Sequence, residues 1–324
     1  MRGILKVIPV RGMRKSPNKE ESRETVLAIA SKLGLEPLVA EQIVGRGFVN
    51  EVWRVRALPM DVVIRLNHDR EAQAVLAEYE MEATCYRVAA GGGMASPRIL
   101  GTGLHRNRAY LAAEFVPGIA GDDHANRLDA WRRLGACGAA IHRLPVPPEP
   151  WRIFPLLARG SDDEWSSQRR LNLDALSSED PLVGLGVYHP DEIDRLRQLF
   201  ESLPDGPVGL CHGDLAPRNL IFSDSGDTVV LDWGCANVHL IPFYDLEGLL
   251  RNHLLENAPT FAELTAFAEG YGWSPDEFAA IRTLAEAYLL LKSFDLVRWA
   301  LARCPERLDE VTKRATLLWS TLRS

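Results

Sequence analysis

Hydrophobic positions near the start of the chain follow first a helical and then a strand-like pattern. Between Glu20 and Leu33 they recur every three or four residues, and Gly34 and Pro37 follow, which predicts a short leading helix. Residues 38–66 contain apolar and β-branched runs, LVAEQIV, FVNEVWRV and DVVIRL, separated by turn residues. These runs predict three antiparallel strands.

The next part of the chain completes a compact N-terminal lobe. A charged, alanine-rich helix is predicted from about Arg70 to Ala90, where three glycines end it, and two strand-like runs follow, PRILGTGL and RAYLAAEFV. A proline and a glycine then end the last strand, so we expect a boundary near residue 116. The predicted N-terminal lobe, residues 1–116, holds an antiparallel sheet and one main helix besides the leading helix.

The rest of the chain, residues 117–324, is predicted to be a larger and mainly helical lobe. Leucine, alanine and tryptophan recur at helical spacing from 128 to 144, within 162–203, and from 243 to 322. Short strands are expected at GLCHGD, NLIF and TVVLD. The fold class is therefore α+β with two lobes.

Composition and charge exclude several classes of function. The formal net charge of -7 argues against broad contact with nucleic acid, which requires a basic surface. No apolar run approaches the roughly 18 residues of a membrane span, so we expect a cytoplasmic protein without a membrane partner. The five scattered cysteines form no C-x-x-C pair and are expected to be reduced thiols.

The segment LCHGDLAPRNLIF contains the most informative pattern in the chain. His212, Gly213, Asp214 and Asn219 form H-G-D-x-x-x-x-N, and a D-x-G segment follows at residues 232–234. Four fixed residues at this spacing would occur by chance on the order of one time in a thousand. The pattern therefore indicates a built site rather than turns that happen to be rich in Asp and Asn.

Phosphoryl transfer explains why these residue types are needed. The reaction requires an oriented acceptor hydroxyl and neutralisation of negative charge on the triphosphate. Asp214 would accept a hydrogen bond from the hydroxyl, and Asn219 and Asp232 offer the hard oxygen ligands that Mg²⁺ prefers. We expect His212 to be structural, forming hydrogen bonds to nearby main chain.

This motif resembles that of the aminoglycoside phosphotransferase and choline kinase superfamily, relatives of the protein kinases, and the resemblance covers nearly the whole chain. It implies a protein-kinase-like fold, Mg²⁺, and ATP or GTP as phosphoryl donor. It also implies that a glycine-containing turn, with Gly45, Gly47 and Phe48, covers the phosphates. An ordinary hairpin remains the alternative for that turn.

The same resemblance assigns further nucleotide-binding residues. Arg65 in DVVIRL takes the place of a basic residue that holds the α- and β-phosphates, where the family more often has lysine. Glu82 matches the family's helix glutamate, its partner, better than Glu78 or Glu80. YLAAEFVPG resembles the segment whose main chain pairs with adenine, which implicates Ala113, Glu114, Phe115 and Val116.

Two further features bear on the substrate. Gly213 replaces the arginine of protein kinases and no A-P-E sequence follows Asp232, so a protein substrate is not expected. Asp245 matches an aspartate that the family keeps after its D-x-G segment, although the usual Gly-Asp-Pro is missing. Acidic residues at 162–164, 179–180 and 256 line either an acceptor pocket or a solvated face.

The sequence thus predicts a small-molecule kinase that acts on a hydroxyl group. An aminoglycoside-like or other hydroxylated amine is the first choice of acceptor, and a macrolide or a metabolite such as choline, a sugar or hydroxylysine is the alternative. A nucleotide-binding pseudokinase stays open as another class, although all three polar groups of the catalytic set are present. The protein is expected to be a monomer or homodimer.

Overall fold

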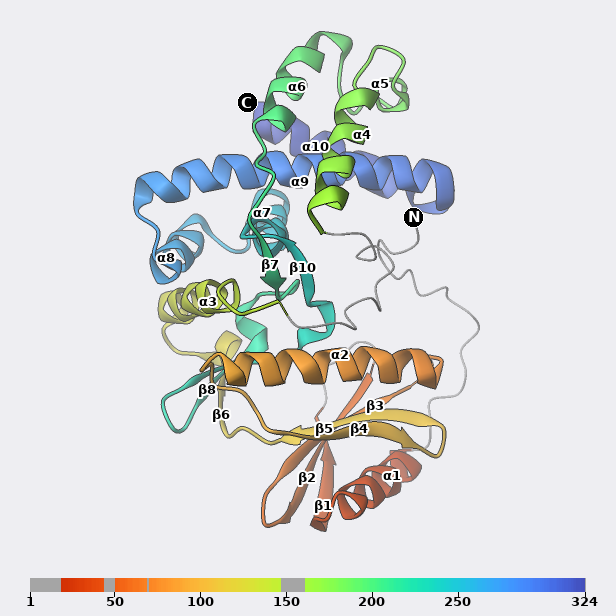
Figure 1. Ribbon diagram of the computed structural model, residues 1–324, viewed down its shortest axis with the longest axis vertical. Coiled ribbons are helices and arrows are strands. Elements are labelled where there is room, and N and C mark those ends of the chain that lie inside the picture. The colour runs from red at the N-terminus through yellow and green to blue at the C-terminus, as the bar shows by residue number, and fades with distance from the viewer. Residues whose placement is uncertain (1–18, 44–49, 69, 147–160, 324) are drawn as a thin grey trace. The chain divides into compact units, whose positions relative to one another are not determined.

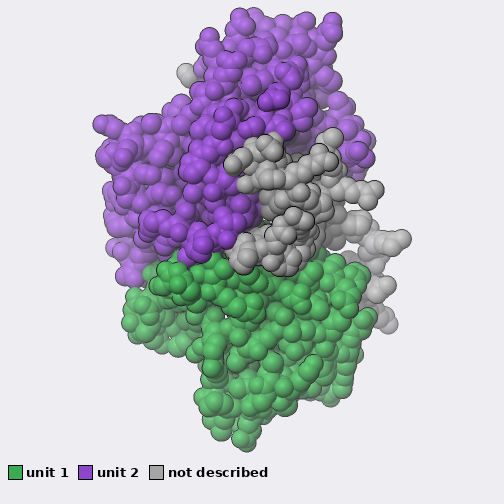
Figure 2. Space-filling view, viewed as in Figure 1, with its two compact units in different colours: residues 1–120, 147–158, 219–236 green, residues 121–146, 159–218, 237–324 purple. Residues whose placement is uncertain are grey.

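The computed structural model describes residues 19–43, 50–68, 70–146 and 161–323, and these form two compact units (Figures 1 and 2). The first unit comprises the described residues up to 120 together with 219–236, and the second comprises the rest. Residues 219–236 join the first unit because their hairpin pairs with a strand at 118–120. By this division the first unit extends to residue 120 and also takes in residues 219–236, and the boundary near residue 116 stays a prediction.

A five-stranded antiparallel sheet is the centre of the first unit, as the strand-like runs predict. Its central strands carry apolar residues on both faces, and β5 is buried over five consecutive residues. In spatial order the strands are β1 (Glu36–Gln42), β2 (Asn50–Leu58), β3 (Val62–Asn67), β5 (Arg108–Glu114) and β4 (Ile99–His105).

Two helices, α1 (Lys19–Lys32) and α2 (Ala72–Gly91), cover opposite faces of this sheet (Figure 1). Successive side chains of a strand point to opposite faces. Along β5, Tyr110 and Ala112 accordingly pack in the cluster that contains α1, whereas Leu111 and Ala113 pack against α2. A strand covered on both sides reads as a continuous apolar run, which is the pattern of RAYLAAE.

A second, three-stranded sheet in the first unit contains the segment that follows the H-G-D motif. Its strands, in spatial order, are β6 (Gly118–Ala120), β8 (Leu220–Ser223) and β9 (Thr228–Val230). The sequence predicts β8 and β9 but gives no sign of β6. Gly118 has φ 153°, and a Cβ there would lie 2.3 Å from the Phe222 carbonyl oxygen, so the pairing requires glycine.

The second unit is mainly helical, as predicted. Its α-helices are α3 (Arg127–Ile141), α4 (Ser161–Ala175), α5 (Pro181–Gly184), α6 (Ile193–Glu201), α7 (Phe243–Glu256), α8 (Phe261–Tyr271), α9 (Pro275–Arg303) and α10 (Leu308–Arg323). Shorter 3₁₀ turns are η1 (Gly121–Asp123), η4 (Pro190–Glu192) and η7 (Pro305–Arg307). Among the described residues, no helix combines the length and apolar character needed to cross a membrane.

Glycines allow a close helix contact in this unit, between α3 and α8. A Cβ at Gly135 would lie 1.9 Å from the Phe267 carbonyl oxygen, and one at Gly270 would lie 1.7 Å from the Arg132 carbonyl oxygen. Each helix therefore places a glycine against the main chain of the other. This contact fixes α3, whose C-terminal end carries His142.

A two-stranded antiparallel ladder, β7 (Val208–Cys211) with β10 (Asn237–Leu240), supports the H-G-D segment, which begins directly after β7. The sequence predicts β7 but not β10. The remaining 3₁₀ turns, η5 (Pro217–Asn219) and η6 (Trp233–Cys235), lie at the two motifs. The H-G-D motif and the D-x-G segment thus both follow short strands that end in tight turns.

Candidate active site

Arg65 and Glu82 form a buried ion pair in the first unit. Ile64 and Leu66 on β3 point into the cluster beneath α1, so Arg65 between them points to the opposite face, toward α2. Its Nη1 lies 2.5 Å from Glu82 Oε1. Glu78, one helical turn earlier, is instead paired with Arg70, so Glu82 is the helix carboxylate that meets Arg65.

Burial and charge act in opposite directions on this pair. The Glu82 side chain is 1% exposed, and burial raises its pKa to about 7, although the Arg65 guanidinium opposes the rise. For Arg65, burial favours the neutral form, but the carboxylates of Glu82 and Asp232 raise its pKa above the ordinary value. The guanidinium therefore stays charged while held between two acidic groups.

Asp232 supplies the second of these acidic groups. Its Oδ1 lies 3.2 Å from Arg65 Nη1, and its side chain is about half exposed, unlike that of Glu82. Asp232 has φ 62° and ψ 62°, the left-handed conformation, which is uncommon for a residue other than glycine. Its main-chain N–H donates a hydrogen bond to the Tyr86 hydroxyl of α2 at 3.0 Å.

Asn219 is brought to Asp232 by the β8–β9 hairpin. Leu220 pairs with Val230, and the Leu231 N–H donates to the Asn219 carbonyl at 2.8 Å, so Asn219 lies opposite the residue that precedes Asp232. Asn219 is buried, whereas the Asp232 carboxylate is accessible. A side-chain amide and a carboxylate at the base of one hairpin are a donor set that suits Mg²⁺.

The segment expected beside adenine forms the end of β5. Ala113 is buried on the α2 face, and Glu114 is exposed. The Glu114 N–H donates to the Arg98 carbonyl at 2.9 Å, and the Phe115 N–H donates to the Asp61 carbonyl at 3.0 Å. Glu114 and Phe115 therefore direct their main-chain N–H groups to opposite sides of this extended chain. Val116 follows without regular secondary structure. Gly45, Gly47 and Phe48 lie outside the described residues.

In the second unit, Asp214 follows β7 and pairs with a cation of its own motif. The Arg218 Nη2 contacts Asp214 Oδ1, and both side chains are substantially exposed. His212 is fully buried, and its Nδ1 accepts a hydrogen bond from the Asp214 N–H at 3.3 Å. The hydrogen bond expected between His212 and nearby main chain is therefore present.

Asp245, in the first turn of α7, fixes the main chain just before Asp214. Its Oδ1 accepts from the Gly213 N–H at 2.6 Å, and its Oδ2 accepts from the His212 N–H at 3.0 Å. His142 at the end of α3 also donates to Oδ2, through Nε2 at 2.9 Å. Although burial opposes it, these hydrogen bonds and the neighbouring histidines hold the pKa of Asp245 below its usual value.

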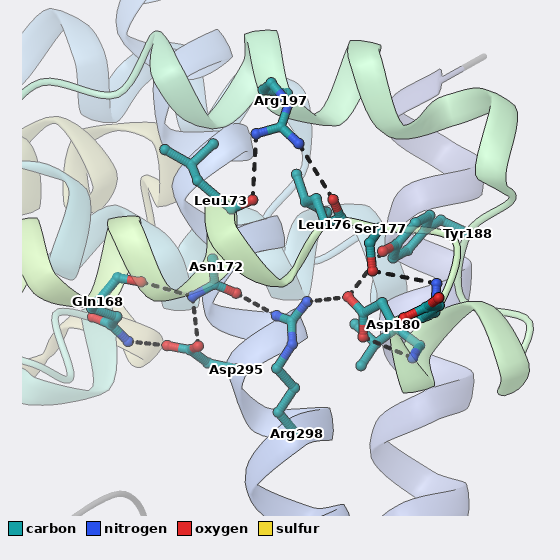
Figure 3. Close-up of polar contacts among 12 residues, drawn as sticks. Gln168, Asn172, Leu173, Leu176, Ser177, Asp180, Tyr188, Arg197, Asp295 and Arg298 are labelled. Carbon is teal, nitrogen blue, oxygen red and sulfur yellow. Dashed lines mark hydrogen bonds and ion pairs between the residues drawn. The ribbon is translucent and has the colours of Figure 1, made fainter.

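The acidic residues predicted to line a pocket or a solvated face divide between different environments. Asp180 is buried, where it accepts from Arg298 Nη2 at 2.5 Å and from the Tyr188 hydroxyl at 2.9 Å (Figure 3). Arg298 also donates to Asn172, whose amide contacts Asp295 at 2.6 Å. This network joins α4, the turn before α5, and α9, so Asp180 has a structural environment rather than either expected one.

The other acidic residues add little to a pocket. Glu179 and Glu256 are exposed, and the side chains at 162–164 lie outside the described residues. Glu256 at the end of α7 therefore matches the solvated alternative.

Sequence reasoning did not identify Tyr86, Arg218 or His142. Tyr86 lies four residues after Glu82, so helical spacing alone places both on one face of α2. Arg218 likewise lies four residues after Asp214, inside the motif. No comparable signal existed for His142, because its partners Asp245 and Tyr271 lie more than 100 residues away.

Comparisons with known proteins identify similar solved structures and a matching family. Among solved structures, the aminoglycoside phosphotransferase APH(4)-Ia is 16% identical with a TM-score of 0.59, covering 93% of this chain and 98% of its own. The macrolide 2'-phosphotransferase MphH from Brachybacterium faecium is 22% identical with a TM-score of 0.56, and the match covers 91% of this chain and 98% of MphH. The spectinomycin phosphotransferase APH(9)-Ia, in complex with ADP and spectinomycin, is 15% identical with a TM-score of 0.54, covering 95% and 100%.

These likenesses establish the protein-kinase-like fold, with its antiparallel N-terminal sheet and mainly helical C-terminal part. No curated protein sequence matches the chain significantly. The model of the phosphotransferase enzyme family matches residues 41–284, a span that includes Arg65, Glu82 and both motifs. The chain therefore belongs to the phosphotransferase enzyme family.

Proposed function

We propose that this protein transfers the γ-phosphoryl group of a magnesium nucleotide to a hydroxyl of a small molecule. The observation that carries the proposal is the cluster of Arg65, Glu82 and Asp232, with Asn219 at the base of the same hairpin. A buried carboxylate holds a permanently charged guanidinium, which in turn contacts a more exposed carboxylate. This arrangement suits a charged polyphosphate better than a neutral ligand.

The nucleotide would bind to the N-terminal lobe, residues 1–116, with the D-x-G segment. Arg65 has further N–H donors with which to bind phosphate oxygens. The Glu114 carbonyl and the Val116 N–H would pair with the base, because the Phe115 N–H is already donated to Asp61. We assign Gly45, Gly47 and Phe48 to the turn over the phosphates on the family pattern alone.

Asn219 and Asp232 would hold Mg²⁺, which when bound shields the negative charge of the phosphates. The half-exposed Asp232 carboxylate can still accept a ligand, and Arg65 orients it from one side. Arg65 takes the place of the lysine that is more common in the family. Its Nη1 contacts both Glu82 and Asp232. A lysine at this position would have to make both contacts with its single ammonium group.

Asp214 would orient the acceptor hydroxyl and receive its proton. The acceptor oxygen forms a bond to the γ-phosphorus, the bond from that phosphorus to the β,γ-bridging oxygen breaks, and the nucleoside diphosphate leaves. Asp245 supports this step by fixing the two amides that precede Asp214. Arg218, which contacts the Asp214 carboxylate, must leave one of its oxygens accessible to the hydroxyl.

The favoured acceptor is an aminoglycoside-like or other hydroxylated amine, bound by the C-terminal lobe, residues 117–324. The net charge of -7 favours approach of a cation. Because Arg218 already pairs with Asp214, an amine of the acceptor would bind elsewhere in the lobe, so the preference for a cation is modest. A macrolide, choline, a sugar or hydroxylysine is the alternative acceptor.

ATP or GTP would be the donor. The similar spectinomycin phosphotransferase is in complex with ADP, and a variant of APH(4)-Ia is in a ternary complex with AMP-PNP and hygromycin B. These adenine nucleotides favour ATP for the present chain as well.

Two measurements test the proposed function. Calorimetric titration with ATP and with GTP, each with and without Mg²⁺, should show metal-dependent binding that Arg65→Ala weakens. A screen of nucleoside diphosphate release over aminoglycosides, macrolides, choline, amino alcohols and sugars should then identify an acceptor. Absence of nucleotide binding would refute the kinase assignment, and binding without turnover of any acceptor would favour a pseudokinase.

A further inference from the structure

Tyr86 on α2 contacts the D-x-G segment at its main chain rather than at a side chain. The residue is 5% exposed, and its hydroxyl accepts the Asp232 N–H at 3.0 Å. Its ring packs edge-on against Trp233, the next residue, with centroids 6.4 Å apart. A helix side chain thus holds both the amide of Asp232 and the residue that follows it.

The conformation of Asp232 makes this contact significant. With φ 62° and ψ 62°, Asp232 has a left-handed main chain that side-chain-bearing residues rarely adopt. Such a conformation persists only where the surroundings stabilise it. Donation of the Asp232 N–H to a buried hydroxyl fixes the orientation of the peptide plane, and this orientation together with φ sets the Cα–Cβ direction of Asp232.

The Tyr86 hydroxyl also forms a hydrogen bond to Glu82, one helical turn earlier. Glu82 contacts Arg65 at 2.5 Å, and Arg65 contacts the Asp232 carboxylate at 3.2 Å. The contacts close a ring in which α2 holds Asp232 twice, at its main chain through Tyr86 and at its carboxylate through Arg65. All members of the ring belong to the first unit.

We propose that Tyr86 is a positioning residue, which holds Asp232 in the left-handed conformation that presents its carboxylate to Mg²⁺. This inference rests on the proposed function, since it concerns the same metal site. It adds that metal-dependent nucleotide binding is coupled to the position of α2 through one hydroxyl group. Because Arg65 keeps its own contact with Glu82, Tyr86 should act mainly on the metal ligand and less on the guanidinium that binds the phosphates.

The test compares Tyr86→Phe with Tyr188→Phe in the second unit. Tyr86→Phe removes a buried hydroxyl that accepts from the Asp232 N–H and also bonds to Glu82, and Tyr188→Phe removes a buried hydroxyl that donates to Asp180. Tyr86→Phe keeps the ring that packs on Trp233. Both variants should lower the melting temperature to a similar extent, so Tyr188→Phe controls for loss of stability alone.

Titration of ATP and hydrogen exchange provide the readouts. With Mg²⁺, Tyr86→Phe should weaken ATP binding about five- to tenfold, the effect of the hydrogen bond lost at the Asp232 N–H together with a less fixed backbone. Without Mg²⁺ its affinity should stay within twofold of wild type, and Tyr188→Phe should match wild type in both conditions. In the nucleotide-free protein, the Asp232 amide should exchange slowly in wild type and in Tyr188→Phe, and faster in Tyr86→Phe.

Other results would overturn the inference. Equal loss of affinity with and without Mg²⁺ would assign Tyr86 a general structural role, and an unprotected Asp232 amide in wild type would show that Tyr86 does not hold it. These outcomes are separable from failure of the proposed function, because exchange in the nucleotide-free protein needs neither nucleotide nor metal.

Discussion

Replacing Asp245 with asparagine should destabilise the second unit strongly, although the change removes only a charge and two lone pairs. The carboxylate is buried and accepts three hydrogen bonds, from the His212 and Gly213 amides and from His142 Nε2. An asparagine side chain has one oxygen and one NH₂ group. In either orientation the NH₂ group must face at least one N–H donor.

The magnitude follows from counting these contacts. The less costly orientation keeps the amide oxygen toward His212 and His142 and loses the bond to Gly213. A hydrogen bond to a charged acceptor contributes about 1.5–3 kcal/mol, and a buried N–H left without a partner costs about 1–3 kcal/mol. We therefore expect a loss of at least about 2.5 kcal/mol, or a fall of at least about 5 °C in melting temperature.

Urea unfolding of wild type, Asp245→Asn and the control Asp224→Asn measures this loss. Asp224 is exposed between β8 and β9, so its variant should stay within about 0.5 kcal/mol of wild type. The pKa of Asp245 in the folded protein is lower than its ordinary value of 3.8. The ionised carboxylate therefore stabilises the fold above pH 3.8, and this stabilisation is lost as pH falls through the folded pKa. The gap between wild type and Asp245→Asn should be constant from pH 8 to 5 and narrow below about 4. A gap under 1 kcal/mol at pH 7 would refute the reasoning.

Three further predictions concern other residues. Asp214→Asn should lower kcat roughly 10²–10⁴-fold with nucleotide affinity within a few-fold of wild type, and full turnover on a confirmed acceptor would contradict the role of Asp214. Burial raises the pKa of Glu82 from 4.5 to about 7. The free energy of unfolding of wild type, measured relative to Glu82→Gln, should therefore fall as pH rises from 4.5 to about 7. A difference in urea titrations that does not change with pH would count against this. Gly135→Ala should cost about 2–3 kcal/mol because the methyl group meets the Phe267 carbonyl, whereas Gly184→Ala, with open space around it, should not lower the melting temperature.

Local patterns predicted most of the elements because those elements carry their own periodicity. The β-branched run DVVIRL predicted β3, and in the structure Arg65 lies on the face opposite Ile64 and Leu66, where α2 packs. The strands that the sequence did not reveal, β6 and β10, have three and four residues. Each pairs with a strand far along the chain, so no local pattern marks it.

A motif that fixes both residue type and spacing predicted Asp214, Asn219 and Asp232 as candidate residues, and the structure brings Asn219 and Asp232 to the base of one hairpin. Partners from distant segments were not predictable. The acidic pair at 179–180 reads as a charge run, but Asp180 is buried because Arg298, 118 residues later, neutralises it. A run of charged residues predicts exposure to solvent, but a cation from a distant segment can pair with one of them and allow it to be buried.

The β8–β9 hairpin keeps Asn219 and Asp232 close in space although they are separated along the sequence. The Asn219 carbonyl and the Leu231 amide are joined at its base, whereas residues 224–227 form an exposed tip. Extra residues at the tip would lengthen the interval between the two motifs without moving Asn219 or Asp232. Searches for related sequences should therefore leave this interval variable and require only two short flanking strands. The same tip offers a point where a peptide tag or a fluorescent reporter could be inserted.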